Sequence, residues 1–221
     1  MLATYKDGKA HLPAYLDDYA FLLDGLLEIQ QTRWRTGDLQ FAVEIADVML
    51  EHFEDKKSGG FFFTADDHEQ LIQRPKPLTD DATPSGNGTA ALALGRLGHV
   101  LGEARYLDAA TRTLEAAWSE MARMPYAYGT LLNALEEHLH PPQIIVLRGD
   151  VGAMQPWFEL CRKHFSPHRL TFAIPASEKN LPGVLAQQSI AAGVTAYVCE
   201  GVSCSAPIAA LAELERQLQY P

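Results

Sequence analysis

The sequence has few cysteines, no basic run and no long apolar run. Its 221 residues carry a formal net charge of −10, and the longest basic cluster, Lys56-Lys57, stands beside acidic residues. Because phosphate groups attract clustered lysine and arginine, this charge argues against nucleic acid and anionic membrane as partners. No stretch approaches the ~18 consecutive apolar residues of a membrane span. The first residues, MLATYKDGKAH, also lack a basic segment followed by an apolar one, so we predict a cytoplasmic protein.

The three cysteines are an odd number, which fits a reducing compartment better than a disulfide framework. Neither zinc-type Cys/His spacing nor Cys-x-x-Cys occurs, and we expect no metal and no cofactor. Cys199 and Cys204 lie at the end of a predicted strand and in the turn after it. We expect them to be close together but reduced, and two interpretations stay open: a redox pair, or two buried thiols. Cys161, beside Trp157 and Phe158, is predicted to lie in the core.

Apolar residues recur at helical spacing through the first two thirds of the chain. Gly37 and Gly102 each stand in a short break between two predicted helices. An offset of about 65 residues relates two helical hairpins; it matches Leu27 with Leu92, Phe41 with Tyr106, and Phe53 with Trp118. The long connection between the hairpins contains GGFFFTADDHEQLIQR, which predicts a short β-hairpin around an acidic turn.

After Pro141 the pattern changes. Strands are predicted over 143–149, 169–175 and 194–201, and helices over 154–165 and 207–218. Because strands that alternate with helices favour parallel pairing, we expect a small parallel sheet. The sequence therefore predicts two domains: helical hairpins over 1–140 and a small α/β subdomain over 141–221.

Two acidic motifs stand at predicted helix starts. In TDDATPSGNG, Asp80 and Asp81 precede a turn, and Ser85 or Asn87 could cap the helix that follows. The second motif is YLDDYA, in which Tyr15 and Tyr19 flank Asp17 and Asp18, and His11 lies just before it. Carboxylates accept hydrogen bonds from sugar hydroxyls, and aromatic rings stack on sugars. Helix capping and complementation of the helix dipole are the alternative interpretation.

Four segments together resemble a known family: AHLPAYLDDYAFLLDGLLEI, GGFFFTADDHEQLIQRPKP, DDATPSGNGTAALALGRLG and TAYVCEGVSCSAP. They look like the C-terminal part of the thioredoxin-domain-containing proteins of the spermatogenesis-associated type. The resemblance implies a thioredoxin-like domain followed by an (α/α)6 toroid, which is similar to N-acylglucosamine 2-epimerases and six-hairpin glycosidases. It implies no established activity. The thioredoxin-like domain and the early hairpins of the toroid are absent here, so the chain looks like a fragment or a truncated relative.

We therefore expect a mainly α fold: an incomplete (α/α)6 toroid followed by the α/β subdomain. The expected function is carbohydrate binding or processing. Asp18 and Asp81, from different hairpins, are the candidate catalytic pair, with carboxyl groups within ~10 Å of each other. The expected substrate-binding residues are His11, Tyr15, Asp17, Tyr19, Asp80, Ser85 and Asn87. The alternatives are a non-catalytic scaffold for a thioredoxin-like domain, and thiol redox chemistry through Cys199 and Cys204.

The expected ligand is a sugar, and a homodimer is expected through the open edge of the toroid. That edge would expose a set of residues too apolar to be left in water: Leu22, Leu23, Leu26, Leu27, Ile45, Met49 and Phe53.

Overall fold

A computed structural model describes residues 1–68, 72–164, 166–191, 193–201 and 203–219. The helical part contains α1 (Leu16–Thr32), α2 (Thr36–Val48), a π-helical turn η1 (Met49–Phe53), α3 (Gly86–Leu101), α4 (Ala104–Arg123) and α5 (Gly129–Leu139). Helix α3 packs against both α1 and α5, so these three helices lie side by side. Helices α2 and α4 pack against α1 and α3. The mainly α fold with a small α/β part is confirmed.

The breaks between helices are set by local backbone chemistry. Gly102 follows α3 with φ 68° and ψ 34°, a left-handed conformation that glycine adopts readily. The predicted break at this residue is confirmed. Gly37, in contrast, lies inside the first turn of α2, and the break comes at residues 33–35.

The expected β-hairpin within residues 59–74 is wrong for the part that the structure describes, and residues 69–71 lie outside it. A single antiparallel bridge joins Glu54 to Phe61, and the rest of the described segment is irregular. Both backbone polar groups of Phe61 bond to the Asn87 side chain, and Phe63 N–H donates to Pro75 O. These bonds satisfy the backbone without a strand ladder.

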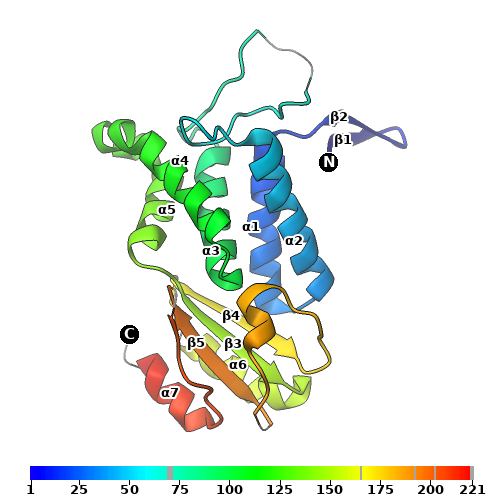
Figure 1. The fold of residues 1–221 in the computed structure, drawn as a ribbon, viewed down its shortest axis with the longest axis vertical. Coiled ribbons are helices and arrows are strands. Elements are labelled where there is room, and N and C mark those ends of the chain that lie inside the picture. Colours follow the sequence, from blue (N-terminus) through cyan, green and yellow to red (C-terminus); the bar gives the residue numbers. More distant parts are fainter. Residues whose placement is uncertain (69–71, 165, 192, 202, 220–221) are drawn as a thin grey trace.

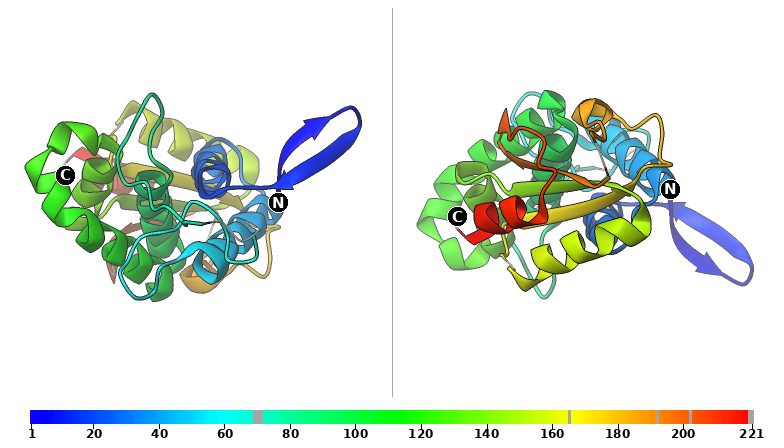
Figure 2. Two further views of the ribbon diagram at one scale, coloured as in Figure 1. Left: turned by 90° about the horizontal axis from the view of Figure 1, so that it is seen from above. Right: turned by 90° about the horizontal axis from the view of Figure 1, so that it is seen from below.

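A β-hairpin forms instead at the N-terminus, where β1 (Leu2–Lys6) pairs antiparallel with β2 (Lys9–Pro13). Asp7 and Gly8 have φ values of 53° and 78°, which suit a two-residue hairpin turn. Figure 2 shows that this hairpin projects away from the body of the molecule.

The C-terminal part holds a four-stranded sheet in the order β4-β3-β5-β6. Its strands are β3 (Gln143–Gly149), β4 (Arg169–Pro175), β5 (Thr195–Glu200) and β6 (Ser203–Cys204). β3 is parallel to β4, as expected, but antiparallel to β5, so the sheet is mixed and not wholly parallel. A parallel return needs a crossover connection. α6 (Val151–Lys163) supplies one between β3 and β4, whereas the described residues between β4 and β5 contain only the 3-10 turn η3 (Gly183–Gln187).

Both faces of the sheet are covered. Ile144 and Phe172 face the helices and belong to the same hydrophobic core as α1 and α3. Ile145 and Leu147 face α6 and α7 (Leu211–Gln219). The sheet lies at the C-terminal ends of α1 and α3, and the 54–85 loop and the β1–β2 hairpin lie at the opposite end (Figure 1). Because the two parts share a core, the division into two domains stays a prediction.

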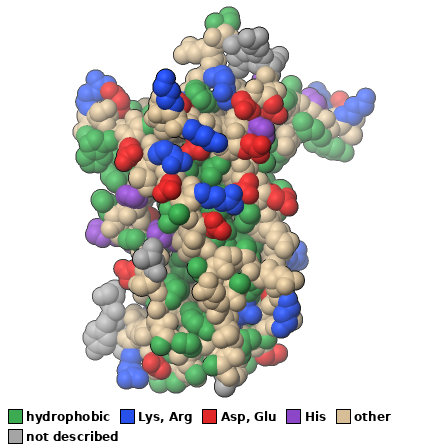
Figure 3. All heavy atoms as spheres, viewed as in Figure 1, with side chains coloured by type: hydrophobic (Ala, Val, Ile, Leu, Met, Phe, Trp, Pro, Cys, Tyr) green, Lys and Arg blue, Asp and Glu red, His purple; other side chains and the backbone are tan. Residues whose placement is uncertain are grey.

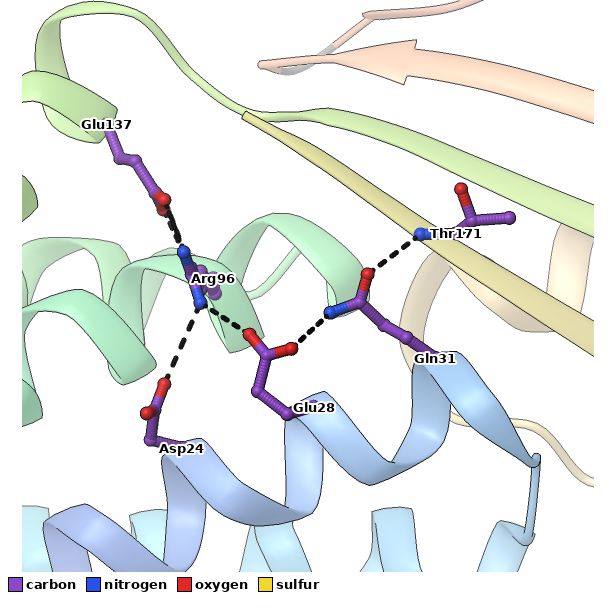
Figure 4. Close-up of polar contacts among 6 residues, drawn as sticks. All are labelled: Asp24, Glu28, Gln31, Arg96, Glu137 and Thr171. Carbon is purple, nitrogen blue, oxygen red and sulfur yellow. Dashed lines mark hydrogen bonds and ion pairs between the residues drawn. The ribbon is translucent and has the colours of Figure 1, made fainter. Parts of the chain in front are cut away.

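A charged network ties three helices to the sheet (Figure 4). Arg96 of α3 forms a bidentate pair with Glu137 of α5, at 2.6 and 2.9 Å, and bonds Glu28 of α1 at 3.0 Å. Gln31 donates to Glu28 and accepts a hydrogen bond from the backbone N–H of Thr171 on β4.

Among the described helices, none is both long and apolar enough to cross a membrane.

Self-association stays a prediction, but it needs a different surface. Most residues expected at the open edge are buried within the chain, and Leu22 is partly buried against the same core. On α1, Phe21 and Ile29 are instead 39% and 42% exposed, on one stripe with Gly25 between them. We expect light scattering to show a dimer at micromolar concentration, through an interface of at least ~1,200 Å².

Replacing Phe21 and Ile29 together by serine should yield a monomer. Trp118→Ser is the matched control, because Trp118 is 57% exposed on α4, and this variant should remain a dimer. A wild-type protein that is monomeric at these concentrations would contradict the prediction.

Candidate functional site

The two acidic motifs lie at the same end of the helical part. Helices α1, α3 and α5 begin there, next to the 54–85 loop (Figure 1). On the face drawn in Figure 3, charged side chains of both signs gather over this end of the molecule. This shared end is where we look for a polar binding site.

Tyr15 and Asp18 close the start of α1. The backbone N–H of Tyr15 donates to Asp18 Oδ2 at 2.9 Å, as in a capping box. The Tyr15 ring stacks on Phe63 with centroids 4.7 Å apart, and His68 lies 5.9 Å from it at a tilt. One carboxylate oxygen of Asp18 is therefore used within the helix, and one face of the Tyr15 ring is covered.

Asp17 points away from its own helix, toward the start of α3. A Cβ added to Gly86 would overlap the Asp17 carboxylate, so the absence of a side chain at Gly86 makes room for it. Asp17 Oδ1 is buried and has no hydrogen-bond partner in the described part of the chain. Burial, and secondarily the charge of Asp18, raise the pKa of Asp17. A buried carboxylate oxygen with no donor is the feature here that most needs an explanation.

Asp80 and Ser85 hold helix starts together. Asp80 Oδ1 accepts from Ser85 N–H, and Asp80 Oδ2 accepts from Thr130 N–H, both at 2.8 Å. Burial alone would raise the pKa of Asp80, but these hydrogen bonds outweigh it and lower the pKa. Ser85 is the N-cap of α3, and its Oγ accepts from Gly88 N–H at 3.1 Å. The capping alternative therefore applies to these two residues.

Asn87 is fully buried. Its Oδ1 accepts from Phe61 N–H at 2.7 Å, and its Nδ2 donates to Phe61 O and Pro77 O at 2.9 and 2.8 Å. The amide is thus occupied in fastening the 54–85 loop to α3, and no donor is left for a ligand. Asn87 has a structural role in this arrangement.

The other candidates are exposed or lie in the core. Tyr19 is 7% exposed, its ring packs on Phe53, and its hydroxyl accepts from the terminal amine of Met1. It therefore offers no stacking face to a sugar. His11 is exposed on β2, and Asp81 is exposed in the loop. The catalytic pairing of Asp18 with Asp81 stays a prediction.

Sequence reasoning missed a cluster beside this site. His52 Nδ1 lies 2.8 Å from Asp66 Oδ1, and His52, Asp66 and Asp67 place ligand atoms within 4.8 Å of one another. The hydrogen bond to Asp66 raises the pKa of His52. These side-chain types can bind a divalent cation, but both aspartates are exposed and the His52–Asp66 bond accounts for the arrangement. His52 is too far in the sequence from the Ala-Asp-Asp segment 65–67 for the two to be recognised as one metal-binding motif.

Cys199 and Cys204 lie in the sheet, at the other end of the helices. The expectation that they are close is confirmed, but the expected reduced state is contradicted, because they form a disulfide. They are directly opposite each other on β5 and β6, where an antiparallel pair brings Cβ atoms close together. Cys161 is buried as expected, and burial raises its pKa to about 11.

No family model matches the sequence. The chain is similar to spermatogenesis-associated protein 20 of Homo sapiens, at 30% identity over 215 residues that cover 94% of this chain and 27% of that protein. The Rattus norvegicus protein of the same name is 29% identical over 212 residues, again 27% of its length. An uncharacterized protein of Caenorhabditis elegans is 26% identical over 214 residues. The chain thus spans about a quarter of the length of these relatives.

Proposed function

We propose that this chain binds a carbohydrate at the end of the helical part where α1 and α3 begin, with Asp17 as the main polar contact. The observation that carries the proposal is the buried Asp17 Oδ1, which has no hydrogen-bond donor, in a carboxyl group whose pKa is raised. Perturbed carboxyl groups of this kind gather at functional sites. Asp17 as a whole is only partly buried, so a ligand can approach its carboxyl group, for which a sugar hydroxyl is a suitable donor.

The helical arrangement supports the same proposal. A layer of α1, α3 and α5, with α2 and α4 packed against it, resembles an arc of an (α/α) toroid, in which helix starts and long loops share one end. Asp18 keeps one carboxylate oxygen outside its bond to Tyr15, and Asp81 is exposed. Both can therefore reach a ligand, and they remain our candidates for acid and base in carbohydrate processing. Such processing is proposed for a longer protein, of which this chain resembles a part.

The test is sugar binding by Asp17→Asn. We expect saturation-transfer NMR to detect binding of N-acetylglucosamine, N-acetylmannosamine or glucose to the wild type, and the variant to bind at least about tenfold more weakly, because hydrogen bonds to charged groups are strong. Affinity should also fall as the pH drops through the raised pKa of Asp17, since the protonated carboxyl accepts less well. Asp108→Asn, an exposed substitution on α4, is the control and should bind like the wild type.

Stability distinguishes binding from folding in this test. Because burial disfavours the charged form of Asp17, Asp17→Asn should not lower the free energy of unfolding at neutral pH. A folded Asp17→Asn variant that binds sugars as well as the wild type would rule out Asp17 as the contact.

Two other functions have support. A non-catalytic scaffold for a thioredoxin-like domain is supported by Asp80, Ser85 and Asn87, whose polar groups serve internal hydrogen bonds. A folded wild-type protein that binds no sugar would favour it. Thiol redox chemistry is supported by the Cys199–Cys204 disulfide, whose Cys204 side is exposed.

A further inference from the structure

A cavity of 260 Å³ lies where the end of α3 and the start of α4 meet the sheet. Its wall is mainly apolar, with Leu107 from α4, Ile144 and Val146 from β3, and Val184 from η3. The Cys199–Cys204 disulfide also lines it. The cavity is lined by residues at the C-terminal end of α3, whereas Asp17 lies against Gly86 at its start, so the cavity is independent of the proposed carbohydrate site.

Two polar groups in this wall lack partners among the residues that the structure describes. Gln188 is only 7% exposed, and its Oε1 is buried with no hydrogen-bond donor, while its Nε2 lies 3.9 Å from Cys199 Sγ. His99 also lines the cavity, and its Nδ1 is buried without a partner. Burial lowers the pKa of His99, and a hydrogen bond to the Gly201 backbone opposes this only in part. The imidazole is therefore neutral at neutral pH, and its unprotonated nitrogen is able to accept a hydrogen bond from a ligand.

From these groups we infer that the cavity binds a compact, mainly apolar molecule that carries a hydrogen-bond donor. A buried acceptor without a donor is unfavourable by an amount comparable to a hydrogen bond, and a ligand hydroxyl or N–H would remove that penalty. The volume is below the ~300–1,000 Å³ typical of drug-sized ligands, so the ligand is about the size of one substituted ring. We expect the hydroxyl or N–H group of the ligand to donate to Gln188 Oε1, with His99 as the alternative acceptor.

Phenol and toluene are the probes that test this inference. They have nearly the same shape, but only phenol has a donor. A purely apolar cavity would prefer toluene, which is the more hydrophobic. We expect ¹H–¹⁵N NMR titration of the wild-type chain to show saturable shifts at cavity residues, with phenol bound about fivefold more tightly than toluene.

Three variants locate the effect. Gln188→Leu removes the acceptor and should abolish or reverse the preference for phenol. Gln187→Leu is the matched control, because Gln187 is exposed and outside the cavity wall, and it should keep the wild-type preference. Ala104→Phe places a ring at the exposed start of α4, where Ala104 lines the cavity, and should weaken both probes. The inference fails if phenol causes no saturable shifts at the cavity, or if Gln188→Leu keeps the preference.

Discussion

Replacing Arg96 by methionine is expected to lower the free energy of unfolding by about 3–5 kcal/mol, the usual effect of removing one partner of a buried ion pair. The Arg96 and Glu137 side chains are 13% and 12% exposed and form a bidentate pair. Methionine keeps much of the apolar stem but leaves the Glu137 carboxylate buried without a cation. The loss also releases Glu28. Glu28 accepts a hydrogen bond from Gln31 on the same helix, and Gln31 in turn bonds the backbone of β4.

Asp24, which faces Arg96 together with Glu28 and Glu137, gives this loss a pH dependence. Burial raises the pKa of Asp24, and Arg96 opposes this shift from 3.7 Å. Without Arg96 the pKa of Asp24 should rise further. A carboxyl group with a raised pKa binds its proton more tightly in the folded state, so protonation favours folding. The destabilisation of Arg96→Met should therefore shrink as the pH falls from neutral through the raised pKa of Asp24.

Urea unfolding at several pH values measures both effects. Arg123→Met is the control: Arg123 is 66% exposed and, among the described residues, pairs with Glu120 of its own helix alone, so a change within about 0.5 kcal/mol is expected. Adding Glu137→Gln to Arg96→Met should recover part of the loss, because the stranded charge is removed. Equal destabilisation by Arg96→Met and Arg123→Met would show that the network contributes nothing beyond a surface pair.

The helices were predictable because their apolar spacing is a local property of the sequence. The stripe through Leu23, Leu27, Leu94 and Leu97 reports which face of α1 and α3 is buried, whatever lies against it. The direction of β5 was not predictable in this way. It depends on a connection that returns without a crossover helix. The apolar pattern of residues 195–200 is compatible with either parallel or antiparallel pairing.

The two acidic motifs do stand at helix starts, as the sequence predicts, but the roles of their residues were not predictable. Short polar side chains at a helix start serve capping and ligand binding equally well, so Asp80 and Asn87 could not be assigned from sequence. Asp17 and Asp18 are adjacent and point about 100° apart on a helix. That difference directs Asp18 back to Tyr15 N–H and Asp17 to the start of α3, and only the tertiary structure shows which carboxylate lacks a donor.

Asn87→Leu is expected to lower the free energy of unfolding by about 3 kcal/mol, since three hydrogen bonds, two of them buried and one partly buried, are lost at ~1 kcal/mol each. Leucine has nearly the same size, so the effect comes from polar groups and not from a cavity. Phe61 N–H, Phe61 O and Pro77 O would be left without their partner. The control is Asn133→Leu, an exposed substitution on α5, which should change stability by less than about 0.5 kcal/mol.

The same variant tests how the loop supports the proposed carbohydrate site. Phe61 and Phe63 are neighbours in the loop, and Phe63 is the residue on which Tyr15 stacks. Loss of the Asn87 bonds should therefore speed hydrogen exchange at the amides of Phe61 and Phe63, while amides in the middle of α1 change much less. Sugar binding should weaken in parallel, although Asn87 does not contact the ligand in our proposal. Unchanged exchange at Phe61 would mean that other contacts hold the loop, and the assignment of Asn87 as its fastening would be wrong.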